Sequence, residues 1–282
     1  MLPFSLLIIF CAPIFIVLSS LFGEYSDNWV HLYNYVLADY VSSTIILISG
    51  VSILTFFIGT ITAWLVTNYD FYGKSFFEWS LILPLSIPPY ILAYTFTGLF
   101  DPFGDANNLM RSIFGLSPEI SIFPNVRNIY GAIIVFSFTL YPYVYLVSRS
   151  AFLNQSMPMK ESARLLGLSE VGVFFRLGLP IIRPAAVGGL MLVIMETLSD
   201  FGAVDHFAIQ TFTTGIFRTW QGMYDLQTAM QLASLLLLMV GLFFILERNS
   251  RNKAAFTSND SSFTSENETR LSNIKSFCAF VV

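Results

Sequence analysis

Long runs without a charged residue constrain this chain more than any other feature. Each run is long enough for an α-helix to cross a hydrocarbon core of about 30 Å, which needs roughly 20 residues. A lipid-embedded backbone must satisfy its polar groups within the segment, so an isolated apolar run has to be a helix. A β-barrel would instead show alternating segments of about ten residues. The sequence therefore predicts an all-α membrane protein with six transmembrane helices. The runs are Met1–Gly23, Val41–Tyr69, Trp79–Phe100, Asn128–Ser148, a stretch from Pro184 that Glu196 and Asp200 interrupt, and Leu226–Leu246.

The composition excludes several classes of protein. Charged residues make up 11% of the chain and the mean hydropathy is +0.68, whereas a soluble domain carries about 25% charged residues. So few charges cannot cover the surface of a soluble enzyme of this size. The formal charge of −4 is too small to indicate a nucleic-acid partner. Two Cys and two His show no metal-binding spacing, and we expect no metal site.

Basic residues predict the orientation in the membrane. With the N-terminus in the cytoplasm, the inner segments hold all of the 14 Lys and Arg residues except Arg111, Arg127 and Arg218. This bias has the sign of the positive-inside rule. We therefore expect a multi-pass protein of the bacterial inner membrane with a cytoplasmic N-terminus.

Composition also divides the chain along its length. Residues 1–251 form the predicted six-helix domain, and residues 252–276 read as a flexible cytoplasmic linker rich in Ser, Asn and Thr. The chain then becomes apolar again over residues 277–282. This end is either a frayed tail or the start of another helix in a truncated chain, and Lys275 just before it favours the second interpretation.

The longest inner loop, residues 152–183, carries helix start and stop signals. Pro158 suits the first turn of a helix. Gly167 suits a helix stop, since glycine adopts φ > 0 without steric cost. Ser169 suits the N-cap of a second short helix, which Pro180 would end. The loop is thus predicted to be a cytoplasmic helix–turn–helix.

The spacing within this loop resembles the EAA loop of ABC importer permeases of the MetI-like, type I fold. The family pattern is Glu-Ala-Ala, then Gly after three residues, then Ile-x-Leu-Pro after nine; this chain departs from it at Ser162 and Leu177. The resemblance implies that the loop docks on a cytoplasmic ABC ATPase and couples ATP hydrolysis to transport. The alternative is an amphipathic helix pair that only anchors the loop at the membrane surface. The predicted coupling residues are Glu161, Ser162, Ala163, Gly167, Leu177, Leu179 and Pro180.

Four further stretches look like permeases of ferric-iron ABC importers. The resemblance implies transport of Fe(III) that a periplasmic substrate-binding protein delivers, with ATP and Mg on the partner ATPase and no cofactor bound by this chain. It also implies a second permease half, which is fused, a second copy or a separate chain. Permeases for thiamine, polyamines, sulfate or phosphonates share the loop, so these solutes and an inactive half-permease are alternatives. The stretches are Phe76–Asp101, Leu140–Ser156, Met195–Phe207 and Thr211–Asp225.

Four residues are predicted to line the translocation pathway or its gate. Glu196 and Asp200 are four residues apart and share one helix face. Glu196 would lie about 18 Å above the inner surface at 1.5 Å per residue, and acids at such depths usually face a bundle interior or a watery path. Pro88 and Pro89 remove backbone donors from the third span. The alternatives are an interhelical hydrogen bond for the acids and a packing kink for the prolines.

An integral-membrane enzyme is the competing class of function. Intramembrane acids could serve acid–base chemistry, but the chain contains no HExxH pair, no GxSxG elbow and no cysteine–histidine set. We therefore predict no catalytic residues and a transport subunit.

Overall fold

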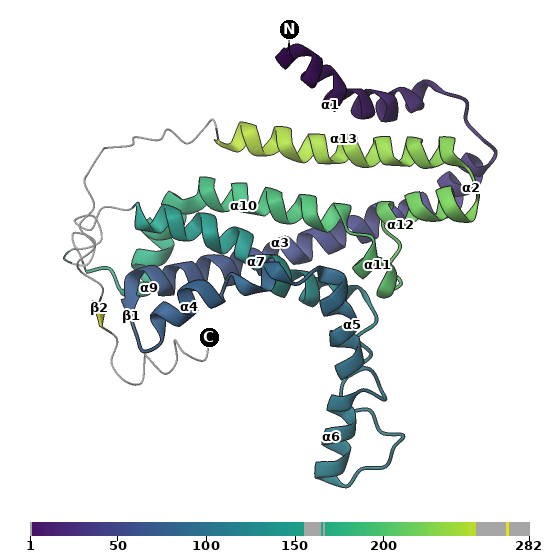
Figure 1. Ribbon diagram of the computed structural model, residues 1–282. Helices are drawn as coiled ribbons and strands as arrows, with labels where there is room; N and C mark the ends of the chain where they lie inside the picture. Colours follow the sequence, from purple (N-terminus) through teal and green to yellow (C-terminus); the bar gives the residue numbers. More distant parts are fainter. Residues whose placement is uncertain (1, 155–164, 166, 252–268, 271–282) are drawn as a thin grey trace. The chain divides into compact units, whose positions relative to one another are not determined.

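A computed structural model describes residues 2–154, 165, 167–251 and 269–270. The chain divides into two compact units, each of which is described by itself. Unit 1 comprises Met1–Ser49, Pro89–Val135 and Met195–Phe244. Unit 2 comprises Gly50–Pro88, Phe136–Ile194 and Ile245–Val282. Helices dominate both units (Figure 1), as the apolar runs predicted.

Among the described residues, four helices are long and apolar enough to cross a membrane. They are α3 (Leu37–Asn68), α7 (Ile129–Leu153), a continuous helical span over Glu170–Ser199 that ends in α10 (Leu179–Ser199), and α13 (Leu226–Arg251), whose apolar part is Leu226–Ile245. In α7, 72% of the most apolar window is buried, against 28–39% in the other three. The helix α7 is therefore the core helix, and the others leave broad apolar faces exposed.

The predicted third span, Trp79–Phe100, is not one helix. The chain forms α4 (Lys74–Ser80) and a 3-10 turn η2 (Leu83–Ser86), and α5 (Pro89–Phe100) begins only after a break. At the break Ile87 is extended, with φ −104° and ψ 113°. Proline disfavours the α conformation at the residue before it but is well suited to open a helix, so Pro88 favours the break at Ile87 and Pro89 begins the next helix. Counted as one broken span, this pair makes a fifth candidate.

The N-terminal apolar run forms α1 (Leu2–Ser19) and the 3-10 turn η1 (Ser20–Phe22). Its described apolar part, Ile8–Phe22, falls in the 10–17-residue class and is shorter than the four long spans. The described residues thus give four candidate spans, or five with the broken pair, and the predicted count of six is not confirmed. The short helix α2 (Asn28–Tyr35) follows.

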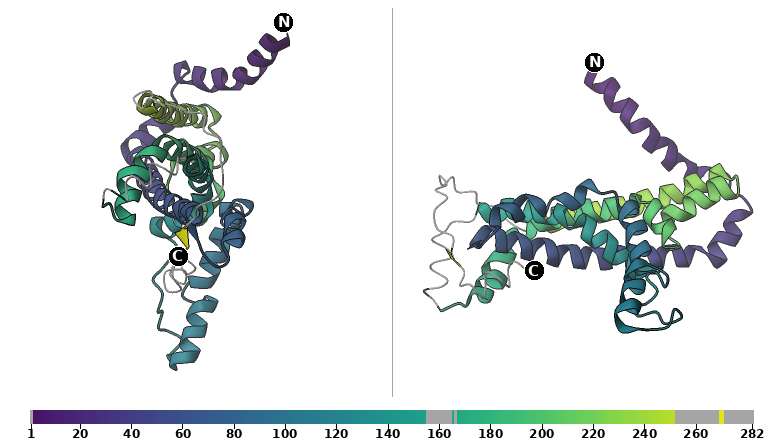
Figure 2. Two further views of the ribbon diagram at one scale, coloured as in Figure 1. Left: turned by 90° about the vertical axis from the view of Figure 1, so that its left-hand side faces the viewer. Right: turned by 60° about the horizontal axis from the view of Figure 1, so that its bottom comes forward.

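Two glycines allow α3 and α10 to approach α7 closely within unit 2. A Cβ atom on Gly59 of α3 would lie 2.8 Å from the Val144 Cβ, and one on Gly189 of α10 would lie 3.0 Å from the Val144 Cα. Figures 1 and 2 show these three helices running alongside one another. Membrane helices lack a hydrophobic force between them and pack best where small residues bring their backbones together.

Unit 1 has its own apolar cluster, built from Leu32, Tyr40, Phe212 and Leu232. Phe212 opens α12 (Phe212–Phe217), which a reciprocal capping box between Thr211 and Thr214 starts. A π-turn η4 (Arg218–Gly222) continues α12, and α11 (Gly202–His206) precedes it.

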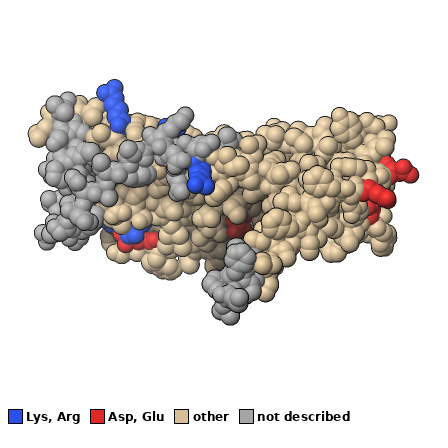
Figure 3. All heavy atoms as spheres, turned by 90° about the horizontal axis from the view of Figure 1, so that it is seen from above, with Lys and Arg blue, Asp and Glu red and all other residues tan. Residues whose placement is uncertain are grey.

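The described surface carries few charges. On the face shown in Figure 3, uncharged side chains cover most of the surface. Large apolar side chains on the long helices are exposed, for example Phe57, Phe138 and Leu238, at 51–55%. Such a surface is suited to lipid and not to water.

Candidate functional site

Within the predicted coupling loop, residues 152–154, 165 and 167–183 are described. Glu161, Ser162 and Ala163 lie outside the described residues. Gly167 has φ +85°, and a Cβ atom built on it would meet nothing within 4 Å. The left-handed conformation expected at this position is therefore confirmed, and backbone conformation, not crowding, favours glycine there.

The second limb of the loop, residues 169–178, begins where the sequence predicted. Ser169 is the N-cap of α9 (Glu170–Val173), and its Oγ accepts a hydrogen bond of 3.2 Å from the Gly172 N–H. The helix continues through a π-turn η3 (Phe174–Gly178) directly into α10.

Pro180 does not end the second helix, so that prediction was wrong. It is the second residue of α10 and follows directly on the π-helical turn, within a continuous helical span over Glu170–Ser199. The preceding π-turn widens the backbone, and the N–H of Leu179 donates to the carbonyl of Phe174, five residues back. Leu177 and Leu179 are half-buried, and Pro180 is exposed.

An aromatic cluster in unit 2 holds this second limb against α3. The Trp64 ring, 7% exposed, packs edge-on against Phe152 and Phe174, with centroids 5.1 and 5.4 Å away. A Cβ atom on Gly178 would lie 2.9 Å from the Trp64 ring. Gly178, between the predicted Leu177 and Leu179, therefore allows the π-turn to contact the indole.

A polar contact lies beside this cluster. The two-residue strand β1 (Tyr69–Asp70) follows α3 and pairs in parallel with β2 (Thr269–Arg270). Tyr69 is 8% exposed, and its hydroxyl donates a short hydrogen bond to the Glu170 carboxylate at the start of α9. Local sequence patterns do not relate this pair, because the two residues are 101 positions apart.

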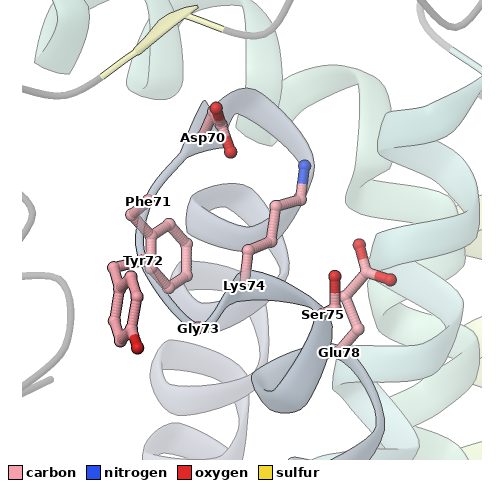
Figure 4. Close-up of a pocket in the computed structure, with 7 residues that line it drawn as sticks. All are labelled: Asp70, Phe71, Tyr72, Gly73, Lys74, Ser75 and Glu78. Atoms are coloured by element: carbon pink, nitrogen blue, oxygen red, sulfur yellow. The ribbon is translucent and has the colours of Figure 1, made fainter.

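The turn after β1 borders an open hollow of about 540 Å³ (Figure 4). Gly73, with φ +84°, reverses the chain here. Figure 4 shows the Tyr72 ring directed away from Lys74 and Glu78. The lining residues are Asp70, Phe71, Tyr72, Gly73, Lys74, Ser75 and Glu78.

Glu78 connects α4 to α7 within unit 2. Its carboxylate lies 3.4 Å from an Arg149 guanidinium nitrogen. Its backbone carbonyl accepts a hydrogen bond of 3.1 Å from the Tyr145 hydroxyl. The C-terminal half of α7 is thus connected to α4, before the proline break.

The predicted pathway acids lie in different environments within unit 1. The Asp200 Oδ1 accepts a hydrogen bond of 2.8 Å from the Ala203 N–H and so caps α11. Glu196, one turn earlier on α10, is exposed. Asp200 therefore has a local structural role, and the pathway role of both acids stays a prediction.

The proline break lies near the same helix end. Pro88 is exposed and Pro89 is half-buried. The next residue, Tyr90, leaves no free space beside Gly202 of α11: a Cβ atom on this glycine would lie 3.0 Å from the Tyr90 Cβ. Within unit 1, the first turn of α5 thus meets the segment that directly follows Asp200.

His206, one turn after Gly202 in α11, makes two contacts with α5. Its ring stacks on Tyr94 with centroids 4.0 Å apart, and its Nε2 lies 2.8 Å from the Thr97 Oγ1. Burial lowers the pKa of His206 and nearby Arg127 lowers it further, while neighbouring acids oppose them more weakly. The imidazole is therefore neutral at pH 7 and supplies a hydrogen bond, not a charge.

The described residues include no group of three or more His, Cys, Asp or Glu side chains that could hold a metal ion.

Solved structures share this fold. The chain superposes with a TM-score of 0.69 on a chain of a bacterial alginate ABC transporter crystallised with its alginate-bound periplasmic protein, covering 89% of this chain and 92% of that one at 18% identity. The arrangement of broken and unbroken helices therefore defines a helical membrane protein with the fold of ABC transporter membrane subunits.

The chain belongs to the family of binding-protein-dependent transport system inner membrane components, which matches residues 55–247. It is 28% identical over 201 residues to the Fe(3+)-transport system permease protein FbpB 2 of Haemophilus influenzae, a match that covers 71% of this chain and 35% of that protein. It is 30% identical over 145 residues to the molybdenum transport system permease protein ModB of the same organism, covering 51% of this chain and 60% of ModB. The chain thus spans less than two thirds of either relative.

Proposed function

We propose that this chain is a permease subunit of an ABC importer and carries a small solute across the inner membrane with ATP that a partner subunit hydrolyses. The family match is the observation that carries this proposal, because it includes the whole loop from residue 152 to 183. Two local features support it: Gly167 is left-handed and Ser169 caps the following helix. A coupling element needs such a defined shape because it must transmit motion between subunits.

The proposed partners follow from this function. A cytoplasmic ABC ATPase binds the loop through Glu161, Gly167 and their neighbours, and a periplasmic binding protein delivers the solute on the other side. A second permease half completes the pathway, as a fused segment, a second copy or a separate chain. The N-terminus is cytoplasmic in this arrangement, in accordance with the basic residues.

Fe(III) is the proposed solute. The iron permease relative matches over 201 residues, a longer stretch than the 145 residues of the molybdenum permease. Glu196 and Asp200 add two acids to the outer part of a predicted pathway, which suits a cation. Pro88 and Pro89 form the proposed gate-lining break.

Molybdate is the second candidate, because the molybdenum permease relative has the higher identity, 30%. An oxyanion needs donors and positive charge along its path, and two carboxylates would oppose it. The two solutes therefore make opposite demands on Glu196 and Asp200.

Uptake in cells that carry the chain with its own ATPase and binding protein tests the proposal. Radioactive Fe(III) should accumulate in these cells, and excess molybdate should not compete. Accumulation of molybdate in place of iron would overturn the substrate assignment. Uptake that continues when the partner ATPase is inactivated would overturn the assignment to an ABC importer.

A further inference from the structure

Within unit 2, the second limb of the coupling loop contacts α3 at Trp64 and, at a separate point, Tyr69, the β1 residue that directly follows α3. At its start, Glu170 accepts the hydrogen bond from the Tyr69 hydroxyl. One to two turns later, Phe174 and Gly178 lie against the Trp64 ring. We call these five residues the brace.

The burial of the brace favours a rigid connection. Trp64 and Tyr69 are 7% and 8% exposed, although both are large and Tyr69 carries a hydroxyl. A buried hydroxyl needs a partner, and a carboxylate acceptor makes the hydrogen bond stronger than a neutral one would. The limb also contacts two residues that are five positions apart, Trp64 and Tyr69. Two such contacts resist rotation of the limb, which a single contact would not.

The π-turn lies between α9, the start of the second limb, and the long helix α10. It occupies Phe174–Gly178, immediately before α10. Insertions of this kind are frequent at functional sites. Here the turn brings Gly178 within 2.9 Å, measured from a built Cβ atom, of the indole. The limb is therefore continuous in sequence with α10 and fixed by side chains to α3.

We propose that the brace passes displacement of the coupling loop to α3, with Tyr69 and Glu170 as positioning residues for coupling. The proposal rests on the proposed function. The brace gives the displacement a second route, through side chains to α3, in addition to the covalent route through α10. The helix α3 then conveys the displacement to α7, because Gly59 brings it against Val144. Both α3 and α10 thus move against the same core helix.

The test uses the complete transporter, purified with its ATPase and binding protein and reconstituted in liposomes, with solute uptake and ATP hydrolysis measured together. Tyr69→Phe keeps the buried ring and removes the hydrogen bond. Tyr72→Phe is the matched control, because Tyr72 is three residues away and 90% exposed. We expect Tyr69→Phe to lower the solute moved per ATP by at least about threefold, with ATPase binding unchanged, and Tyr72→Phe to match the wild type.

Variants of the acceptor complete the test. Glu170→Gln retains an acceptor oxygen and should keep most of the coupling, whereas Glu170→Ala should lose as much as Tyr69→Phe. The double variant Tyr69→Phe with Glu170→Ala should be no worse than either single variant, since one contact is lost in each case. A structural defect alone would lower yield and leave the ratio of solute to ATP unchanged.

The outcomes separate the brace from the function on which it rests. If the wild-type complex couples uptake to ATP and Tyr69→Phe has the same ratio, the brace is wrong and the importer assignment stands. If the wild-type chain neither binds an ATPase nor transports, both are wrong.

Discussion

Gly189 of α10 lies against the backbone of α7 at Val144: a Cβ atom built on the glycine would be 3.0 Å from the Val144 Cα and 3.1 Å from the Tyr143 carbonyl oxygen. A Cβ atom built on the neighbouring Gly188 would meet nothing within 4 Å. The two adjacent glycines therefore test whether α10 needs this close approach.

Gly189→Ala should destabilise the protein because backbone atoms cannot move aside as a side chain can. Overpacking of this kind costs about 1–3 kcal/mol. Gly188→Ala should leave the melting temperature unchanged or slightly raised. The melting temperature of both purified variants in detergent is the measurement, and equal values for the two would show that α10 does not pack on α7 through Gly189.

Substitutions of Gly167 test the conformation of the coupling loop. Its φ of +85° is strained for most side chains, by about 1–2 kcal/mol, and worst for β-branched ones. Gly167→Val should therefore uncouple ATP hydrolysis from uptake, whereas Gly167→Asn should retain most coupling, since asparagine tolerates this region. Space does not limit either variant, because a Cβ atom there meets nothing within 4 Å. Equal coupling in both variants would contradict the expected role of the turn.

The carboxylate of Asp225 makes a pH-dependent contribution to unit 1. Burial raises its pKa, but hydrogen bonds from Ser26, Asn28 and Thr228 outweigh burial and hold the pKa well below its usual value. The side-chain donors lie 2.6–2.8 Å from the Asp225 Oδ2. Because the pKa is lower in the folded state, the stabilisation is complete above the unfolded value of about 3.9 and is lost as the pH falls below it.

Asp225→Asn should therefore lower the melting temperature at pH 7 and have a smaller effect near pH 3. Glu119→Gln, at an exposed loop residue, is the control and should change little at either pH. A deficit of Asp225→Asn that is as large at pH 3 as at pH 7 would argue against an ionised Asp225 as the source of stability.

The two predicted pathway acids should respond differently to neutralisation. Asp200→Asn keeps a side-chain oxygen that can cap α11 through the Ala203 N–H, whereas Asp200→Ala removes it. If Asp200 acts only as a cap, the Asp200→Asn variant should keep the stability and uptake of the wild type. The Asp200→Ala variant should lose about 1 kcal/mol of the free energy of unfolding.

Glu196→Gln separates the pathway interpretation from a packing role, since Glu196 is exposed on α10. A loss of Fe(III) uptake in a fully assembled Glu196→Gln transporter is the expected result. Unchanged uptake with intact assembly would leave Glu196 without a role in the pathway.

Local sequence signals predicted much of this fold. In lipid, a backbone segment must form its own hydrogen bonds, so a charge-free run forms a helix. The helices α3, α7, α10 and α13 coincide with such runs. Ser169 was predicted as an N-cap because capping depends on neighbours three residues away. The break at Ile87 could also be predicted locally, since two consecutive prolines follow it.

The contacts that hold the candidate site together could not be predicted in this way. Tyr69 and Glu170 meet across 101 residues, and no composition or periodicity relates them. The sequence predicts a helix end at Pro180 because proline usually breaks helices, but the helix continues through the π-turn before it. Such features depend on which helices pack together, which a single sequence does not reveal.

Docking of the loop on an ATPase is the central claim, and site-specific photo-crosslinking in intact cells tests it most directly. A photoreactive residue at Leu165, which is 88% exposed within the loop, should crosslink to the cytoplasmic ATPase. The same group at Phe103, which is 82% exposed on the predicted outer side, should not. Crosslinking to the ATPase from Phe103 and not from Leu165 would contradict the orientation and the coupling role together.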